Sequence, residues 1–374
     1  MITTLDEVLR RYDPTRPLSE AETIPREWYL DPRVAELERR AIFGGTWQYV
    51  CAVDQLREPG DFVTTNIAGE PIVVVRDKER RIHAFYNVCR HHAAEVATGP
   101  CGHVAALRCP YHGWTYGLDG QLKGVPEFDG VCNFDKGANG LVPIRVETWE
   151  QFVFVNLQPE GSSLCAYLGD MAPRISLLGL SKLRFVERRH YEFACNWKVY
   201  VDNYLDGGYH IPHIHKGLGS VLDYGQYTIE NKDLFCLQSS PMATGAEGQT
   251  AAVRKGDNAY YYWLFPNFML NWYEGYMDVN YVLPMGLERT LVTFDFFFSD
   301  ATRNESAQSV AVASRIQQED VDICESVQRG LRSSAYSTGR LSVRREAGEQ
   351  HFHRLLYEFL AGGIEPREQR GTGP

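Results

Sequence analysis

The sequence lacks the features of a membrane protein and of a nucleic-acid-binding protein. No stretch reaches the roughly 20 consecutive apolar residues that a membrane helix needs, so we expect no membrane partner. No run of Lys and Arg stands out, and the formal net charge is −10, so we expect no nucleic-acid partner. Residues 1–7 show no charged stretch followed by an apolar one, which argues against a secretory signal.

Cysteine is scarce, and its number is odd. Nine cysteines in 374 residues do not form the pattern of a disulfide framework, so we expect a reducing, cytoplasmic location. The chain also lacks internal repeats, low-complexity segments and a flavin or dinucleotide fingerprint. A hydrophobic content of 44% and a charged content of 23% are ordinary for a globular protein. The length suits two domains or one large domain.

The first part of the chain has the pattern of β structure. A helix is predicted near residues 32–43, and alternating apolar and polar residues, separated by Gly, Pro and Asn, then predict strands. The predicted strands are 61–67, 71–75, 81–88 and 151–157. We therefore predict three parts: an N-terminal segment (1–45) that packs on the last domain, a small all-β domain (46–157) and a larger domain (158–374).

The larger domain has a different pattern, typical of an antiparallel sheet covered by helices. This mixture predicts an α+β fold. The predicted helices are 196–209, 305–331 and 344–360, and the predicted aromatic-rich strands are 260–264, 268–273, 276–283 and 291–298.

Two short Cys/His motifs lie in the β-rich part. Cys89 and His91 form the first, and Cys109 and His112 form the second, with 17 residues between the motifs. Two thiolates and two imidazoles suit a Rieske-type [2Fe–2S] cluster, in which two His replace two Cys on one iron. A zinc knuckle is the alternative, but Cys-x-His is an uncommon half-site for zinc. We interpret the nearby His83, His92, His103 and Cys101 as lying outside the ligand pattern.

A second set of candidate ligands lies within residues 203–215. Asp206 and His210 are four residues apart and would share one face of a helix. His215 follows at a spacing of five, about 140° away on a straight helix, but Pro212 allows the chain to turn. Two His and one carboxylate are the ligands of non-haem Fe(II) oxygenases. A polar helix end is the alternative interpretation, and His213 is a competing imidazole.

The third ligand of this set has two candidates. Asp206 would either bind the metal or orient an imidazole that does. Asp320 lies on the apolar face of the predicted helix 305–331, where a carboxylate is costly unless it is paired or bound to metal. A buried salt bridge would satisfy Asp320 equally well. Glu319 and Asp322 are expected to project away from that face.

Together these motifs resemble those of the α subunits of Rieske non-haem iron oxygenases. The resemblance covers nearly the whole chain and implies an oxygenase with a Rieske domain and a catalytic domain of the helix-grip type. It implies that Cys89, His91, Cys109 and His112 hold the [2Fe–2S] cluster, and that His210, His215 and Asp320 hold a mononuclear Fe(II). The residues that carry it are 89–91, 109–114, 196–215 and 319–320.

The finer resemblance is to the choline monooxygenase branch of that family. The family works as a homotrimer and takes electrons from a separate NAD(P)H-dependent reductase or ferredoxin. The resemblance implies that Asp206 is the catalytic acid that links the iron site to the cluster of a neighbouring subunit. The residues that carry it are 202–210, 266–269, 325–331 and 348–353.

The resemblance leads us to expect O2 and a small quaternary amine as substrates. Hydroxylation of choline to betaine aldehyde hydrate is the first interpretation; N-demethylation of a betaine and hydroxylation of an aromatic ring are the alternatives. Aromatic faces attract quaternary ammonium groups. A different class, an electron carrier or a zinc module, would need only residues 46–157. The aromatic residues expected at the substrate pocket are Tyr204, Trp263, Phe265, Trp272 and Tyr281.

Overall fold

The computed structural model describes residues 4–299 and 302–364. The chain divides into two compact units. The smaller unit is Phe43–Tyr167, and the larger unit combines Met1–Ile42 with Leu168–Pro374. The predicted domain borders after residues 45 and 157 lie close to this division and remain a prediction. None of the helices in the described part of the chain has the length and apolarity that a bilayer crossing needs.

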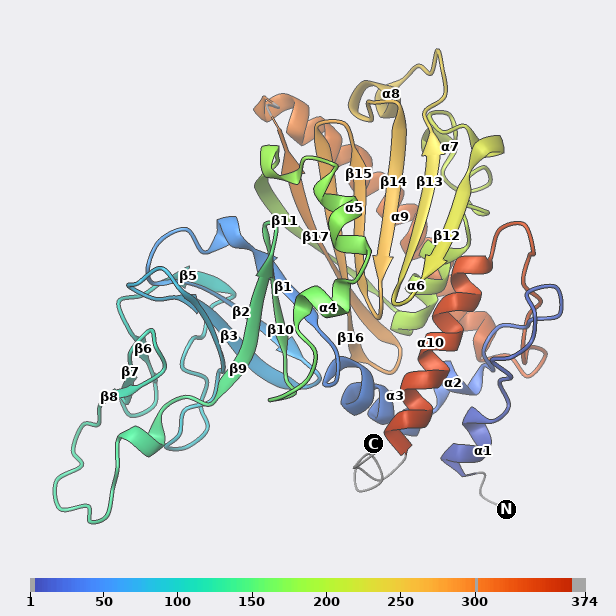
Figure 1. The fold of residues 1–374 in the computed structure, drawn as a ribbon. Coiled ribbons are helices and arrows are strands. Elements are labelled where there is room, and N and C mark those ends of the chain that lie inside the picture. The colour runs from blue at the N-terminus through green and yellow to red at the C-terminus, as the bar shows by residue number, and fades with distance from the viewer. Residues whose placement is uncertain (1–3, 300–301, 365–374) are drawn as a thin grey trace. The chain divides into compact units, whose positions relative to one another are not determined.

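The smaller unit is built on antiparallel strands (Figure 1). Its main sheet has seven strands in the order β1-β10-β9-β4-β3-β2-β5, and a small sheet has the order β6-β7-β8. Ala68 and Gly69 form the two-residue turn between β2 and β3, both with positive φ, which matches the twist of a hairpin. The strands are β1 (Gln48–Ala52), β2 (Asp61–Ile67), β3 (Glu70–Arg76), β4 (Ile82–Tyr86), β5 (Cys101–His103), β6 (Leu107–Arg108), β7 (Thr115–Tyr116), β8 (Leu122–Gly124), β9 (Pro143–Trp149) and β10 (Phe152–Asn156).

The larger unit contains a second antiparallel sheet of seven strands. Its order is β11-β17-β16-β15-β14-β13-β12, so consecutive strands pair except where β11 crosses to the edge beside β17. The edge strand β11 was not predicted, because its charged residues hide any alternation. The strands are β11 (Arg184–Phe193), β12 (Thr228–Lys232), β13 (Phe235–Pro241), β14 (Asn258–Leu264), β15 (Phe268–Tyr273), β16 (Tyr276–Gly286) and β17 (Arg289–Phe298).

Helices cover both faces of this sheet. In Figure 1, α9 lies behind the sheet and α5 in front of it. Thr302 and Glu305 form a capping box that starts α9. The short helix α4 (Leu164–Leu168) spans the division between the units. The other helices are α1 (Leu5–Leu9), α2 (Glu27–Leu30), α3 (Pro32–Glu38), α5 (Met171–Ser176), α6 (Trp197–Leu205), α7 (Lys216–Gly219), α8 (Gln249–Val253), α9 (Arg303–Leu331) and α10 (Ala347–Ile364).

A buried ion pair ties the N-terminal segment to α6. Lys198 donates to Glu38 of α3 at 2.6 Å, and the indole of Trp197 donates to the same carboxylate at 2.9 Å. Both charged side chains are almost fully buried. Removing one partner of such a pair leaves an uncompensated buried charge, so this pair fixes the position of α6.

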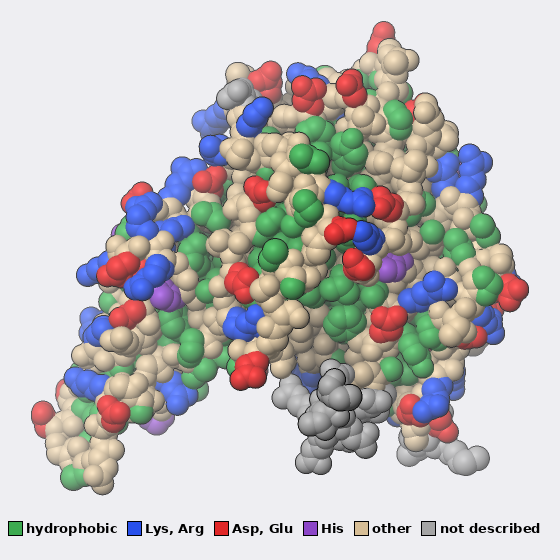
Figure 2. Space-filling view, in the orientation of Figure 1, with side chains coloured by type: hydrophobic (Ala, Val, Ile, Leu, Met, Phe, Trp, Pro, Cys, Tyr) green, Lys and Arg blue, Asp and Glu red, His purple; other side chains and the backbone are tan. Residues whose placement is uncertain are grey.

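The predicted fold class is confirmed: the smaller unit is all-β, and the larger unit packs helices on an antiparallel sheet. Figure 2 shows acidic and basic side chains interspersed over the visible face, consistent with the absence of a basic run in the sequence. The helix predicted near 32–43 is observed, as α3 followed by a π-helical turn at Arg39–Phe43. The helix predicted at 196–209 was too long, because α6 ends at Leu205.

Candidate functional site

Two glycines end α6 and redirect the chain toward the site. Asp206 is the C-cap of α6, and both Gly207 and Gly208 have positive φ. A Cβ at Gly207 would lie 2.1 Å from the carbonyl oxygen of Arg345, so only glycine fits there. We had predicted that Asp206 and His210 share one face of a helix. They do not, because α6 ends at Leu205. The turn nevertheless brings them together.

Three predicted metal ligands, His210, His215 and Asp320, lie close together next to this turn. Ligand atoms of His210, His215 and Asp320 all lie within 4.8 Å of one another. The Nε2 atom of His215 lies 3.0 Å from Oδ1 of Asp320, and the side chain of Asn203 donates to the same oxygen at 2.8 Å. Two imidazoles and one carboxylate are the donor set of a mononuclear non-haem iron site. The residues therefore fit the metal, and their role as ligands remains our proposal.

Each of the two imidazoles is oriented by a carboxylate on its other nitrogen. Nδ1 of His210 lies 2.7 Å from Asp206, and Nδ1 of His215 lies 2.7 Å from Glu319. Such contacts fix the ring and the tautomer, so that Nε2 is left for a metal. Of the two roles considered for Asp206, the geometry supports the orienting one.

The contact of Glu319 corrects a prediction. We expected Glu319 to project away from the apolar face of the helix, on which Asp320 lies. Its longer side chain nevertheless reaches His215. Burial lowers the pKa of His215, but the hydrogen bonds to Asp320 and Glu319 outweigh burial and raise it. A spacing argument alone could not find this contact, because the partner is 104 residues away in the sequence.

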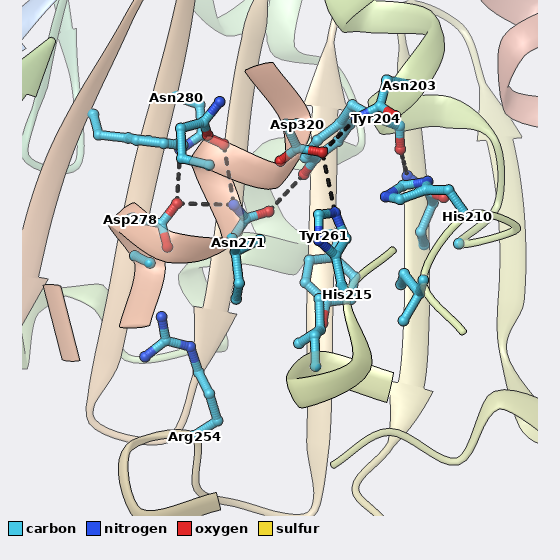
Figure 3. A pocket seen from close by; sticks show the side chains of 18 of the residues that line it. Asn203, Tyr204, His210, His215, Arg254, Tyr261, Asn271, Asp278, Asn280 and Asp320 are labelled. Carbon is cyan, nitrogen blue, oxygen red and sulfur yellow. Dashed lines mark hydrogen bonds and ion pairs between the residues drawn. The ribbon is translucent and has the colours of Figure 1, made fainter. Parts of the chain in front are cut away.

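A cavity of about 120 Å³ opens beside these ligands, between the sheet and the helices α6 and α9. Its walls combine tyrosine rings with a few buried polar groups, and Figure 3 shows ten of the lining residues labelled. The stretch 271–276, considered from the sequence as a possible pocket wall, contributes Asn271 and Tyr273. The lining residues that the sequence had not indicated come from α6, α9, the strands β13, β14, β16 and β17, and the segments before β12 and after α8. They include Tyr200, Tyr227, Gln238, Arg254, Tyr261, Asp278, Asn280, Phe294 and Gln317.

A buried carboxylate, Asp278, lies in the cavity wall. It accepts hydrogen bonds from Asn271 at 2.8 Å, from Asn280 at 2.7 Å and from Tyr276 at 2.6 Å. Burial raises the pKa of Asp278. The hydroxyl of Tyr204 donates to Asn271 at 2.8 Å and so joins this network. The network rigidly positions polar groups next to the iron-ligand set.

Of the five aromatic residues predicted for the pocket, Tyr204 lines it. Trp272 and Tyr281 do not, because the residues of β15 and β16 that line the cavity are Asn271, Tyr273, Asp278 and Asn280. Neighbouring residues of a strand point to opposite faces, so Trp272 and Tyr281 face the other side of the sheet. This corrects their prediction as pocket residues.

Trp263 and Phe265 are also outside the cavity, for a different reason. Both are fully buried. The ring of Trp263 packs edge-on against Phe352, and Phe265 packs against Phe359, both from α10. These two aromatic side chains therefore belong to the core beneath α10, which corrects their prediction as pocket residues.

The four predicted cluster ligands lie on two loops of the smaller unit. Cys89 and His91 follow β4, while Cys109 and His112 lie between β6 and β7. The second loop is tight: the backbone N–H of Gly113 donates to the carbonyl of Cys109, and Gly113 has φ +75°. The imidazole rings of His91 and His112 approach with centroids 4.7 Å apart.

The surroundings of these loops suit an iron–sulfur cluster. Both cysteines are buried, and the hydroxyl of Tyr116 lies 3.3 Å from the sulfur of Cys89. Trp114 stacks on His91 with centroids 4.8 Å apart. Among the described residues, Nδ1 of His91 is buried and has no hydrogen-bond partner, as expected of a nitrogen that serves as a ligand. The residues fit the cluster, and their assignment remains our proposal.

Two of the histidines that we interpreted as lying outside the cluster-ligand pattern form ion pairs or hydrogen bonds with aspartates. His83 pairs with Asp77 at 2.7 Å, and His103 pairs with Asp61 at 2.9 Å. His92, however, lies against His91 with ring centroids 4.1 Å apart. Exposed side chains next to the loops include those of Tyr111 and Val131. The predicted ligand loop therefore ends in an exposed, partly apolar surface.

A second group of possible metal ligands lies between α6 and α10. Asp202, Glu349 and His353 also have ligand atoms within 4.8 Å of one another. Asp202 already accepts a hydrogen bond from Tyr29 at 2.6 Å and contacts His353 at 3.0 Å. Burial raises the pKa of Glu349 well above its ordinary value. We therefore interpret this group as a hydrogen-bonded support that joins α6 to α10.

Comparison with protein-family models gives two matches along the chain. Residues 46–135 match the Rieske [2Fe-2S] domain, and residues 180–362 match the ring hydroxylating alpha subunit (catalytic domain). The choline monooxygenase of Arabidopsis thaliana is 39% identical, over 96% of this chain and 88% of its own length. The carnitine monooxygenase oxygenase subunit of Escherichia coli K12 is 33% identical, over 91% of this chain and 94% of its own length.

Comparison with solved structures also finds Rieske oxygenases. A quaternary ammonium Rieske monooxygenase in complex with L-carnitine has a TM-score of 0.82 and 30% identity, covering 91% of this chain and 96% of its own. Naphthalene 1,2-dioxygenase from Rhodococcus sp., at 21% identity and a TM-score of 0.78, covers 92% of this chain and 95% of its own. The likeness to the latter shows the fold alone.

Proposed function

The chain belongs to the Rieske non-haem iron oxygenases, as an α subunit, and from this we propose that it hydroxylates a small quaternary amine. One oxygen atom of O2 enters a C–H bond of the substrate; the other leaves as water after two electrons and two protons are added. The observation that carries the proposal is the His210, His215 and Asp320 group beside a cavity walled by tyrosine rings. Such rings attract quaternary ammonium ions.

The cofactors are a Rieske [2Fe–2S] cluster and a mononuclear iron. When bound, they supply electron transfer and the activation of O2. As in other α subunits of this family, the electrons come from a separate reductase or ferredoxin. We assign Cys89, His91, Cys109 and His112 to the cluster, and His210, His215 and Asp320 to the iron.

The protein's own groups hold the reacting parts in place. Asp206 and Glu319 each hold one ligand imidazole through Nδ1. Asn203 fixes the carboxylate of Asp320 by donating to it. These contacts keep three ligand atoms on one side of the cavity and leave the opposite side to O2 and substrate. The walls of the cavity also limit the access of water, which suppresses side reactions.

Choline and carnitine are the two leading substrates, because relatives over most of the chain are named for them. Both carry a trimethylammonium group. Five tyrosines line the cavity: Tyr200, Tyr204, Tyr227, Tyr261 and Tyr273. Aromatic rings attract such a group. Hydroxylation of the alcohol carbon of choline would give betaine aldehyde hydrate. Hydroxylation of an N-methyl group would give a carbinolamine whose C–N bond breaks, releasing formaldehyde and leaving a demethylated amine.

We also propose a homotrimer in which the cluster of one protomer serves the iron of the next. Two features support this arrangement. His112 is exposed, and the exposed Tyr111 and Val131 beside it give the loop an apolar surface suited to burial against another protomer. Asp206 would stand at that boundary, because it also contacts the ligand His210.

The function is tested by O2 consumption with a generic reductase and a matched pair of substrates. Choline and carnitine are compared with 3,3-dimethyl-1-butanol, which replaces the charged nitrogen of choline by carbon. We expect O2 uptake and product with the quaternary amines and none with the neutral analogue. Turnover of an aromatic acid without turnover of any quaternary amine would contradict the proposal and favour a ring hydroxylase.

A further inference from the structure

A buried arginine lies in the wall of the cavity, outside the group of iron ligands. Arg254 is only 5% exposed, and it lines the same cavity as His210 and Asp320. Its backbone N–H caps α8 by donating to Thr250. One guanidinium nitrogen donates to the hydroxyl of Ser309 at 2.7 Å. Thus the fold fixes a positive charge inside the substrate cavity.

The charge of Arg254 lacks a direct partner. Among the described residues, no carboxylate forms an ion pair with Arg254. Its side chain contacts Ser309, two aromatic rings and the hydroxyl of Tyr273, and the carboxylate of Asp278 acts on it only through its charge. The guanidinium carbon lies 3.9 Å from the ring centroid of Tyr276 and 5.2 Å from that of Tyr273. Asp278 lines the same cavity but accepts its hydrogen bonds from Asn271, Asn280 and Tyr276 instead. A buried charge is costly unless it is paired, so the cavity favours an anionic group on its ligand.

We propose that Arg254 binds a carboxylate of the substrate, so that the enzyme acts on quaternary amines that also carry a carboxylate in preference to choline. This rests on the proposed function and narrows it to zwitterionic betaines, with carnitine and γ-butyrobetaine as representatives. A guanidinium is planar and presents paired N–H donors that match the two oxygens of a carboxylate. The alcohol of choline gives it no such partner.

The position of Arg254 also orients the substrate. In Figure 3, Arg254 and Asp278 lie on one side of the pocket, and His210, His215 and Asp320 lie on the other, with Asn271 between them. A carboxylate held at Arg254 therefore directs the opposite end of the molecule, the trimethylammonium end, toward the iron ligands. The carbons next to nitrogen are then the ones presented for hydroxylation.

The test uses a pair of ligands that differ only in charge. Binding of γ-butyrobetaine and of its carboxamide, in which an uncharged amide replaces the carboxylate, is measured by calorimetry on the anaerobic holoenzyme. KM values for carnitine and choline are measured as well. We expect the carboxylates to bind about tenfold or more tightly than the amide and choline, as for a charge-assisted hydrogen bond to a buried partner. Arg254→Gln should abolish this difference, while Arg254→Lys should restore part of it.

Arg315→Gln is the control, because Arg315 lies on the exposed side of α9 and contacts only Gln249 among the interactions described. It removes a positive charge without touching the cavity and should leave the preference unchanged. If Arg254→Gln does not fold, the ligand pair on the wild-type enzyme still decides.

Three outcomes overturn the inference. Equal binding of γ-butyrobetaine and its amide shows that no anion site operates. Tighter binding of choline than of carnitine reverses the predicted preference. Tighter binding of phosphocholine than of either carboxylate shows that the arginine serves a phosphate instead. In each case turnover of a quaternary amine keeps the proposed function intact, whereas failure of every quaternary amine to react refutes the function itself.

Discussion

Nε2 of His215 lies 3.0 Å from Oδ1 of Asp320, although 105 residues separate them in the sequence. His215 stands at the start of α7 and Asp320 in the middle of α9. Both are buried, and Asn203 holds the carboxylate from a third element, α6. The proposed iron site therefore depends on three elements that only the complete larger unit brings together.

Replacing Asp320 with Ala should remove the mononuclear iron and spare the cluster. The variant loses the only carboxylate in the group of three ligands that the described structure brings together, and two imidazoles alone bind iron weakly. Iron per protomer should fall from about three to about two, with the visible absorption of the cluster unchanged. Asp322→Ala, on the exposed side of the same helix, is the control. Full iron content in the Asp320 variant would show that Asp320 is not a ligand.

Replacing His112 with Ala should bleach the cluster. His112 is one of two imidazoles whose rings meet in the smaller unit, and the cluster needs both on one iron. The absorption and the electron paramagnetic resonance signal of the reduced cluster report the loss. His103→Ala, at an exposed His that pairs with Asp61, should leave both signals intact. An intact signal in the His112 variant would refute the assignment.

The proposed trimer predicts complementation between two inactive variants. Protomers with His112→Ala keep the iron site, and protomers with Asp320→Ala keep the cluster. Each variant alone should be inactive, whereas co-expressed mixed trimers should regain activity, because a cluster in one protomer can serve an iron in its neighbour. The measurement is substrate-dependent O2 uptake by trimers purified through two different tags. Inactive mixed trimers would mean that electrons travel within one protomer.

Asp77 should make the free energy of unfolding of the smaller unit decrease as the pH becomes acidic. Burial acts to raise the pKa of Asp77, but hydrogen bonds from His83 and Arg81 outweigh it and lower the pKa to about 2. A folded-state pKa below the unfolded value of about 3.9 stabilises the protein above that pH, by about 2 kcal/mol, and this is lost as the pH falls toward 2. Asp77→Asn should therefore lower Tm by a few °C at pH 6.

The difference in Tm between wild type and Asp77→Asn should shrink as the pH falls from 5 toward 2. Asp129→Asn, at an exposed loop position, serves as the reference for loss of a surface carboxylate. A difference that stays constant over this pH range would show that the hydrogen bonds to Asp77 do not depend on its ionisation.

Gly207→Ala should destabilise the larger unit and weaken iron binding. The new Cβ would meet the carbonyl oxygen of Arg345 at 2.1 Å, and φ at this position is +66°. We expect a loss of about 2 kcal/mol or more, because backbone overlap adds to the cost of a left-handed conformation. Gly179→Ala is matched in φ, at +69°, with no described atom within 4 Å of its Cβ, so it should cost only about 1 kcal/mol. Equal losses in chemical denaturation would show that the contact with Arg345 does not matter.

The local parts of the fold and site were predictable from sequence. The strand at 61–67 was predicted at its observed bounds because the turn residues at 68–70, with Gly69 at their centre, mark its end. The Cys/His motifs of the smaller unit lie on short loops, so their spacing already indicated a shared site. Asp320 was found because a carboxylate on the buried face of an amphipathic helix requires a partner.

The walls of the cavity could not be predicted in the same way. Residues 276–283 of β16 are buried on both faces, so the alternation that separates the two faces of a strand carries no polar signal. The face on which Tyr281 lies was therefore undetermined. Arg254 follows a short helix in an irregular segment, and its place in the cavity depends on contacts with Ser309 of α9 and with the rings of Tyr273 and Tyr276.

The smaller unit is one continuous stretch, Phe43–Tyr167, set between two pieces of the larger unit. During synthesis it is complete before residues 168–374 of the larger unit have been made, and domains generally fold as units in the order of their synthesis. The buried ion pair between Glu38 and Lys198 can therefore form only after Lys198 has left the ribosome. A chain released before residue 168 would contain the whole smaller unit and none of the catalytic-domain match, so the order along the chain separates folding of the Rieske domain from folding of the catalytic domain.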